Sequence, residues 1–424
     1  MDKEIDPLKK NSKSPLKKEP KAKPARAKRP VQPETKDVLA ELVEKLRGKL
    51  EPKSAPPSPG KAGQRPELRP NIDRLTVGVD LGDQWSRYCI LDLQGETLRE
   101  GPLRTRQAEL AEFFHALPPA RVVIEVGTHS AWVQEVVASE GHEVLVANPR
   151  LMDGSKRRKR KSDRIDAHKL ARLGRVDPQS LHPITHRSRE VRQDLVLLRA
   201  RDTLVEARTQ LINAARGLVK SLGTRLPPCS SRSFGHKVGD AIPAEAREAL
   251  LPLVQLADEM SACIKVYDRR IEELASEKYG HTELLRQVKG VGSLTSLAYV
   301  LTLETPERFP KSRDVGPYVG LVPKQEDSGE SQPQLGISKA GDTMLRKLLV
   351  GSAHYILGPF GPDTDLRRYG LRLCERGGKK AKKRAAVAVA RKLAVLLHRL
   401  WVSGEVYEPL GYASTAAMAQ KAAA

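Results

Sequence analysis

The sequence predicts an α/β domain followed by a mainly helical half, and three observations support this fold class. Short apolar runs alternate with helical patterns up to about residue 185. After that point, apolar residues spaced three and four apart dominate the chain. The first 70 residues resemble neither part, because they are rich in Lys, Arg, Pro and Ser. The expected parts are a basic arm at 1–70, an α/β domain at 71–185, a helical hairpin at 186–278, a helical domain at 279–405 and a tail at 406–424.

The α/β domain is expected to begin with an antiparallel meander of three strands. Apolar runs at 74–82 and 86–93 predict two strands, and the turn Gln94-Gly95 leads into a third at about 96–103. The elements expected next are a helix at 106–117, a strand at 121–127, a helix at 129–140, a strand at 142–148 and a helical stretch from Lys161. Three antiparallel strands followed by alternating helices and strands is the ribonuclease-H-like order. That order places the first and fourth strands side by side.

Four acidic residues occupy informative positions in these elements. Asp80 lies near the end of the first strand, and Glu125 has a matching position on the fourth. Asp163 and Asp166, three residues apart, project from one face of the following helix. Converging carboxylates repel one another unless cations lie between them, and hard divalent ions prefer oxygen ligands. One acid at a strand end is common in α/β proteins. The four together predict a site for one or two Mg²⁺ (or Mn²⁺) ions and phosphodiester chemistry.

Composition and charge indicate the class of partner. The chain has 424 residues, with 74 Lys and Arg against 52 Asp and Glu, a formal net charge of +22. Such an excess favours a polyanion and a salt-dependent affinity. No apolar run approaches membrane-spanning length and no signal peptide is visible, so we expect a cytoplasmic protein without a membrane partner. Four widely spaced cysteines argue for a reducing compartment and against structural zinc.

The basic arm is expected to be mostly disordered, because its composition lacks the apolar residues that build a core. One segment, 37–47, has helical apolar spacing at Val38, Leu39, Leu42, Val43 and Leu46. Two interpretations remain open for it. It folds against RNA, DNA or a protein partner, or it is a transient helix in a solubilising tail.

Two long helices are predicted to form an antiparallel coiled-coil hairpin. The first covers 188–222, and the second follows a Pro/Ser/Gly-containing segment near 224–242. The second helix carries apolar residues at Met260, Ile264, Tyr267, Ile271 and Leu274. Packed core is one interpretation of this pattern. A projecting hairpin that serves oligomerisation or grips nucleic acid is the other.

Three segments carry signals of nucleic-acid binding. The pattern at 284–298 matches a helix-hairpin-helix, whose glycines allow a tight turn and whose backbone N–H groups hold a phosphate. A basic run at 379–384 precedes a strong helix at 385–401, and another at 156–161 precedes Asp163. A plain helical turn and solvated basic faces are the alternatives. The residues predicted to contact nucleic acid are Lys156, Arg157, Arg158, Lys159, Arg160, Lys161, Lys289, Gly290, Gly292, Lys339, Lys379, Lys380, Lys382, Lys383 and Arg384.

Several motifs together resemble a known family. They are Val79-Asp80-Leu-Gly, Ile124-Glu125, Lys161-Ser-Asp163-Arg-Ile-Asp166-Ala, Val288-Lys-Gly-Val-Gly292, Tyr318-Val-Gly-Leu-Val-Pro323-Lys-Gln325 and Leu335-Gly-Ile-Ser-Lys339. This chain is similar, over about 74–402, to the DEDD transposases of bacterial insertion sequences, the one-ten family. The resemblance implies a resolvase-like (RuvC-type) ribonuclease-H fold whose metal ligands are Asp80, Glu125, Asp163 and Asp166.

The resemblance also implies a serine nucleophile in the loop between the last two motifs. That loop is Glu326-Asp327-Ser328-Gly329-Glu330-Ser331, and the Ser-Gly step of the family falls on Ser328. The family usually has a second Ser before this step and Gly-Lys after it, where this chain has Asp327 and Glu330. Ser331 is therefore a rival for the role.

The partners follow from the same resemblance. Members act on double-stranded donor and target DNA, directed by a non-coding guide (bridge) RNA, and assemble as a homodimer or tetramer with a composite site. A bacterial, nucleoid-associated location is implied. Two other functions remain open at this point. One is a RuvC-like junction nuclease that uses water as its nucleophile, and the other is a non-catalytic RNA/DNA-binding protein.

Overall fold

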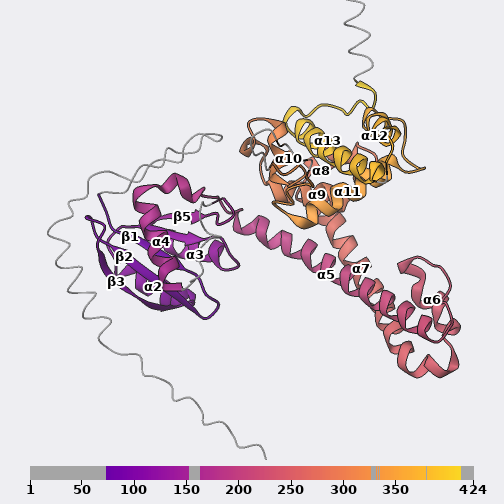
Figure 1. Ribbon diagram of the computed structural model, residues 1–424, viewed down its shortest axis with the longest axis horizontal. Coiled ribbons are helices and arrows are strands. Elements are labelled where there is room, and N and C mark those ends of the chain that lie inside the picture. The colour runs from indigo at the N-terminus through magenta and orange to yellow at the C-terminus, as the bar shows by residue number, and fades with distance from the viewer. Residues whose placement is uncertain are drawn as a thin grey trace, which may run out of the picture. The chain divides into compact units, whose positions relative to one another are not determined.

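The computed structural model describes residues 73–151, 163–325, 331, 333, 335–378 and 380–411, except for the side chains of Asp163 and Arg164. These residues form two compact units, which meet in the sequence between Ile184 and Thr185 (Figure 1). Several predictions lie outside the described residues. They are the disordered arm at 1–70 with its helix at 37–47, the basic run at 156–161, Lys379, and Ser328 with the rest of 326–330.

The first unit is built on a mixed five-stranded sheet with the strand order β3-β2-β1-β4-β5. Its strands are β1 (Thr76–Asp80), β2 (Trp85–Leu91), β3 (Thr97–Arg104), β4 (Arg121–Glu125) and β5 (Glu143–Ala147). β1 is antiparallel to β2 and parallel to β4, and β4 is parallel to β5. The expected contact between the first and fourth strands is confirmed. This mixed sheet is consistent with a ribonuclease-H-like domain.

Helices cover both faces of this sheet. The helices α2 (Gln107–His115) and α3 (Ser130–Ser139) lie on the face to which Val77 and Val79 contribute. The helix α4 (Asp163–Val176) covers the opposite face, where Cys89 and Leu91 pack against Ala167 and Ala171. The alternation follows from the strand repeat, because successive side chains point to opposite faces of a sheet. Each central strand therefore has one face toward α4 and one toward α2 and α3 (Figure 1).

The second unit begins with two long helices that pack along each other. They are α5 (Arg189–Ser221) and α7 (Ala244–Glu277), and α6 (Phe234–Val238) lies against α7 in the connection between them (Figure 1). α7 extends beyond the predicted apolar pattern at both ends and contains Pro252. That proline deprives the Glu248 carbonyl of its helical hydrogen bond. Glu248 is exposed, so water can replace the bond.

The rest of the second unit is a helical domain. Its helices are α8 (His281–Arg286), α9 (Ser293–Leu303), α10 (Val315–Tyr318), α11 (Thr343–Leu357), α12 (Asp365–Glu375) and α13 (Ala381–Ser403). Buried Leu195 and Ile271 of the hairpin pack in the same core as α9, α11 and α13. Lys347 of α11 also bonds Asp202 of α5, with Nζ 2.6 Å from Oδ1. The base of the hairpin therefore belongs to this domain.

Two further findings concern membrane spans and cysteines. In the part of the chain that the structure describes, no helix combines the length and apolar character needed to cross a bilayer. All four cysteines are free thiols, and Cys89 is buried between the sheet and α4.

Candidate active site and nucleic-acid interface

The strand register places Asp80 and Glu125 on one face of the sheet. β1 and β4 pair in parallel from Thr76↔Arg121 to Val79↔Ile124, so Asp80 and Glu125 hold the next positions on two adjacent strands. Gly78 and Val123 lie two residues earlier, and both contact α4. Because side chains alternate along a strand, Asp80 and Glu125 project from this same face. Both residues are partly buried.

Two glycines allow α4 to lie directly on the sheet. A Cβ at Gly78 would overlap the Ala167 carbonyl oxygen and lie 2.5 Å from the Ala171 nitrogen. A Cβ at Gly174 would overlap a methyl group of Val123. The order of these contacts shows that α4 runs opposite to β1, with its N-terminus at the carboxyl ends of β1 and β4. Asp166, in the first turns of α4, is partly buried at this end.

Two arginines hold the far end of α4. Nη1 of the buried Arg121 donates to the Gly174 carbonyl at 3.0 Å, and its other nitrogens bond the Glu143 carboxylate at 3.0 and 3.1 Å. Arg175 donates to the Leu93 carbonyl in the turn before β3. Gly78 contacts α4 near its start, and the two arginines hold its end. These contacts together set the direction of α4 relative to the carboxyl ends of the strands.

The structure therefore brings Asp80, Glu125 and the first turns of α4 to one end of one sheet face. The side chain of Asp163 lies outside the described residues. Among the side chains that are described, no group of three or more His, Cys, Asp or Glu could hold a metal ion. The predicted four-carboxylate cluster thus stays a prediction.

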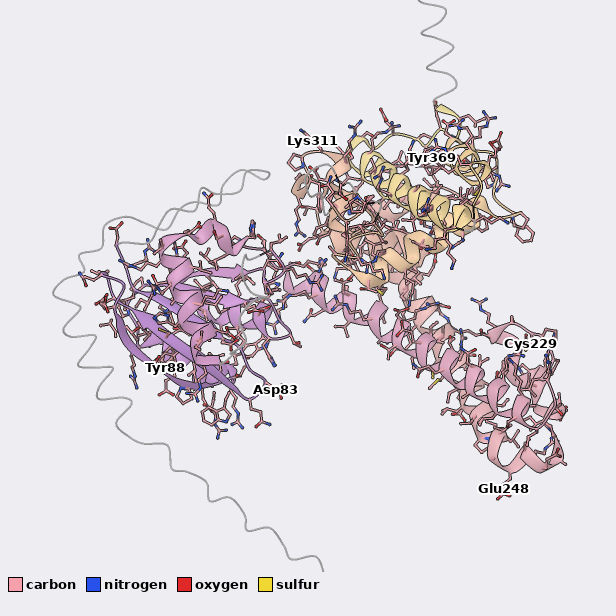
Figure 2. All side chains as sticks on the ribbon, viewed as in Figure 1. Asp83, Tyr88, Cys229, Glu248, Lys311 and Tyr369 are labelled. Atoms are coloured by element: carbon pink, nitrogen blue, oxygen red, sulfur yellow. The ribbon has the colours of Figure 1, made fainter. Side chains whose placement is uncertain are left out.

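Sequence reasoning missed three residues near these carboxylates. The β1–β2 register pairs Asp80 with Arg87, whose exposed side chain lies on the α4 face, because Cys89 two residues on packs against α4. Asp83, 90% exposed and labelled in Figure 2, contacts His129, with Oδ1 3.4 Å from Nε2. These two residues lie in the loop after β1 and at the start of α3. Alternation along β2 could have predicted that Arg87 lies on the same face as Asp80. No sequence pattern predicts the contact between Asp83 and His129.

The two loops are themselves held by local bonds. The Thr105 hydroxyl donates to the Gly82 carbonyl at 2.9 Å and lies 2.8 Å from the Ser86 hydroxyl. Trp132 Nε1–H donates to His129 Nδ1 at 3.1 Å. Nδ1 is therefore the acceptor, so the neutral His129 ring carries its proton on Nε2, which faces Asp83.

In the second unit, the two motifs that flank the serine loop lie side by side. Pro323 and Ile337 form an antiparallel bridge, Lys324 N–H donates to the Gly336 carbonyl at 2.9 Å, and Ser338 N–H donates to Val322 at 2.8 Å. A Cβ at Gly320 would overlap the backbone of Ala340. The loop therefore leaves and returns at one closed base, although Ser328 itself lies outside the described residues.

Arg346 of α11 joins both sides of this base. Its Nη1 donates to the Val319 carbonyl at 3.1 Å and to the Ala340 carbonyl at 2.7 Å. Lys339, a predicted nucleic-acid contact, has φ 55 and is exposed. A non-glycine residue in the left-handed region is strained unless its surroundings fix it. Ser331, the rival nucleophile, is also exposed.

The other predicted nucleic-acid residues lie at helix ends. Lys289 and Gly290 are in the connection between α8 and α9, and Gly292 is the N-cap of α9. Gly290 has φ +99, and a Cβ there would lie 2.9 Å from the Tyr355 ring, so both conformation and space require glycine. Lys380, Lys382, Lys383 and Arg384 are exposed at the start of α13, whose first turn has no acidic residue. Cations at the positive end of a helix are unfavourable without a bound anion.

Comparison with known proteins agrees with the fold. Residues 77–223 match the family model for DEDD transposases of the IS110 type, described as Transposase. Residues 282–363 match the model described as Transposase IS116/IS110/IS902 family. The mixed sheet with carboxylates on its adjacent central strands is consistent with the ribonuclease-H-like domain of a DEDD transposase.

Several bacterial proteins are similar along most of the chain. The transposase for insertion sequence element IS1111A of Coxiella burnetii is 28% identical over 344 residues, which cover 79% of this chain and 92% of that protein. A probable family 20 transposase of Pseudomonas aeruginosa is 28% identical over 354 residues, covering 80% and 99%. The chain belongs to the IS110 family of transposases.

Proposed function

We propose that this protein is a DNA transposase and recombinase that cuts and rejoins strands to excise and insert a mobile element. Asp80, Glu125, Asp163 and Asp166 form its metal site, Ser328 is its nucleophile, and a guide RNA selects donor and target DNA. The observation that carries the proposal is the register of β1 and β4. It places Asp80 and Glu125 on adjacent strands, at the end of the sheet where α4 begins with Asp163 and Asp166.

The donor set suits a hard divalent cation. All four ligands are carboxylates, and Mg²⁺ and Mn²⁺ favour such oxygen ligands together with substrate phosphate. When bound, the ions would stabilise negative charge on the reacting phosphate and on the attacking oxygen. The N-terminus of α4 carries partial positive charge, which also favours clustered carboxylates. Arg87, beside Asp80 on the same face, supplies a cation for the phosphate backbone.

The proposed reaction conserves phosphoester bonds. Ser328 Oγ attacks the DNA phosphorus as its proton leaves, an Oγ–P ester forms, and one DNA P–O bond breaks to release a hydroxyl that takes up a proton. Attack of a DNA hydroxyl on the phosphoserine reverses these steps with a new strand, so no ATP is needed. Ser328 lies in the loop whose base Arg346 closes, with exposed Lys324 and Lys339 at that base.

The remaining parts of the proposal concern partners and location. The formal charge of +22 and the basic start of α13 support double-stranded DNA and RNA as partners. Guide RNA, a homodimer or tetramer, and a cytoplasmic, nucleoid-associated location are carried over from the family resemblance. Sequencing of RNA that co-purifies with the protein tests whether it binds a guide RNA. RNA with no common sequence would argue against a dedicated guide.

The metal site is tested by single substitutions of its carboxylates. Asp166→Asn and Asp80→Asn keep the side-chain volume and remove the negative charge, so strand cleavage should fall below detection while RNA binding stays near wild type. Asp73→Asn is the matched control, because Asp73 is exposed and precedes β1, at the end of that strand away from Asp80. Wild-type recombination by Asp166→Asn would show that the cluster is assigned wrongly.

The nucleophile is tested by trapping the protein on DNA. A suicide DNA substrate should give a covalent adduct with the wild type and with Ser331→Ala, but none with Ser328→Ala. Peptide mapping then identifies the linked serine. A link at Ser331 would reject the Ser328 assignment. Cleavage without any adduct would instead indicate water as the nucleophile, as in a junction nuclease.

A further inference from the structure

One stretch of the hairpin has an unusual charge composition. Residues 207–239 contain six Lys and Arg and no Asp or Glu, in a chain that is otherwise mixed in charge. The stretch covers the end of α5 and the connection that contains α6. It has its own small core, in which Ile212, Val219 and Phe234 pack against α7. The six cations therefore belong to a folded part of the hairpin.

Two of the six cations have structural roles. Arg216 donates to the Leu226 carbonyl at 3.3 Å and the Pro227 carbonyl at 3.0 Å, and its guanidinium lies 5.3 Å from the Phe234 ring centre. Arg208 is only 9% exposed and donates to Ser261 at 3.1 Å. The Arg216 contacts fix the connection onto α5, and the Arg208 contact joins α5 to α7.

The other four cations point to solvent. Lys220, Arg225, Arg232 and Lys237, here called the basic flank, are all exposed, and no carboxylate pairs with them among the described residues. Burial lowers the pKa of the Arg208 guanidinium, and the charges of Arg201 and Arg232 lower it further. The acids closest to this stretch belong to α7: the Asp258 side chain lies against Gly235, and Asp268 raises the pKa of Arg208.

The opposite side of the tip has a different character. Glu245 and Glu248 are exposed in the first turns of α7, and Asp240 lies 3.5 Å from Arg247. Figure 2 shows Cys229, in the connection, and Glu248, on α7, at different edges of the tip. The acidic residues of the tip thus lie at the end of the connection and in the first turns of α7, outside the stretch 207–239.

We propose that the basic flank is a docking surface for the phosphodiester backbone of a nucleic-acid duplex. Exposed cations on a supported frame and the lack of acids along 207–239 suit a polyanion, whose backbone presents closely spaced negative charges. The contacts are to phosphates, so they stabilise the complex without reading base sequence. The inference rests on the proposed function, which makes nucleic acid the partner.

The test compares salt dependence of binding in the full-length protein. The triple variant Arg225→Gln, Arg232→Gln, Lys237→Gln is titrated with a short DNA duplex and with an RNA duplex of the same sequence. The slope of log K against log salt is negative, and each lost phosphate contact reduces its magnitude by about 0.9, so a reduction of about 2–3 in magnitude is expected. The DNA and RNA arms show which backbone the flank holds, and a decrease in either supports the proposal.

A control variant separates a local effect from loss of net charge. Lys265, Arg269 and Arg270 are exposed on α7 of the same hairpin, and their change to Gln removes the same charge. This control should keep the wild-type slope, and Arg225→Lys with Arg232→Lys should do the same. An unchanged slope in the flank variant, or an equal decrease in the control, would overturn the inference. If the wild type binds neither duplex, the result contradicts the proposed function itself and not only the role of the basic flank.

A second copy of the chain is the competing occupant. Leu218 and Leu222, 52% and 48% exposed, lie near Lys220 at the end of α5. Sedimentation of the flank variant decides this point. A change in oligomeric state with an unchanged salt slope would assign the surface to self-association and overturn the proposal.

Discussion

Gly78 is the residue at which the strand carrying Asp80 lies closest to the helix carrying Asp166. Its missing side chain lets the Ala167 carbonyl oxygen approach the strand. The same position faces α4 because it alternates with Val77 and Val79, which belong to the opposite core. One hydrogen atom in place of a methyl group thus helps to set the spacing of the carboxylates.

Gly78→Ala should both destabilise the first unit and impair catalysis. The added methyl group forces α4 away from β1, which costs about 1–3 kcal/mol in unfolding free energy. Because about 1 Å of misplacement costs on the order of 100-fold in rate, cleavage should fall by a similar factor. Denaturant unfolding and strand cleavage measure the two effects.

The matched control is Gly217→Ala in α5, where an added Cβ meets nothing within 4 Å. It should stabilise the protein by about 0.5–1 kcal/mol, because alanine restricts the unfolded chain. Equal stability of the two variants would show that α4 and β1 do not touch at Gly78.

His142 should make the stability of the first unit depend on pH. Its Nδ1 accepts the Ala120 N–H at 3.1 Å, so Nε2–H donates to the Phe114 carbonyl at 2.9 Å and the ring is neutral. Burial lowers the pKa of His142 below its ordinary value of 6.5. The unfolded chain therefore binds the proton first as pH falls, and stability decreases below about pH 6.5 by up to about 1.4 kcal/mol per pH unit.

His142→Gln provides the comparison for this effect. The variant lacks the titrating ring, so its unfolding free energy should vary less between neutral and mildly acidic pH, even though its stability is lower throughout. Denaturant titrations at several pH values measure both slopes. Parallel slopes in the wild type and the variant would contradict the role of His142.

At the scale of elements, the two motifs around the serine loop, 318–325 and 335–339, are joined by backbone hydrogen bonds. Their backbones bond at Lys324–Gly336 and Ser338–Val322. Arg346 bonds one carbonyl from each side, Val319 and Ala340. Both bonds come from Nη1, and Nη2 donates to the Thr343 hydroxyl at 3.2 Å, so the guanidinium makes three bonds at this base.

Arg346→Met should open this base. Loss of two charge-assisted bonds costs about 2–4 kcal/mol, and the amides of Ser338 and Lys339 should exchange with solvent at least about tenfold faster. Hydrogen exchange with mass spectrometry measures this directly. Arg313→Met is the control, because Arg313 is an exposed cation and its loss should stay within about 0.5 kcal/mol. Unchanged exchange at both amides would show that Arg346 does not close the loop.

At the scale of the whole molecule, charge is distributed unevenly. Residues 1–70 carry nineteen Lys and Arg against ten Asp and Glu, which is +9 of the total +22. The remaining excess belongs to residues 71–424, which include the basic run at 156–161, the basic flank and the start of α13. Nucleic-acid affinity should therefore have separable contributions from the arm and from the folded parts.

Deletion of residues 1–70 should weaken DNA and RNA binding and flatten its salt dependence without stopping strand cleavage. The arm supplies positive charge, whereas the carboxylates and Ser328 remain. Binding titrations at several salt concentrations and single-turnover cleavage at saturating protein separate the two effects. Loss of cleavage at saturation would give the arm a role in chemistry. A protease-resistant arm in the free protein would contradict its predicted disorder.

The sequence by itself determined the elements and their faces, because side-chain periodicity is a local property. Short apolar runs at 74–82 and 121–127 predicted the two strands that carry Asp80 and Glu125, and the order of elements predicted that they are neighbours. Spacing of three and four predicted α5 and the part of α7 from Met260 to Leu274. The family motifs predicted which carboxylates and which serine loop to consider.

Only the tertiary structure decided which residues from separate elements meet. Arg87 lies beside Asp80 because of the β1–β2 register, and His129 reaches Asp83 because two loops end at the same edge of the sheet. The closed base at Arg346 and the basic flank likewise depend on contacts between distant segments. Such contacts are set by packing of the whole chain, and no local repeat encodes them.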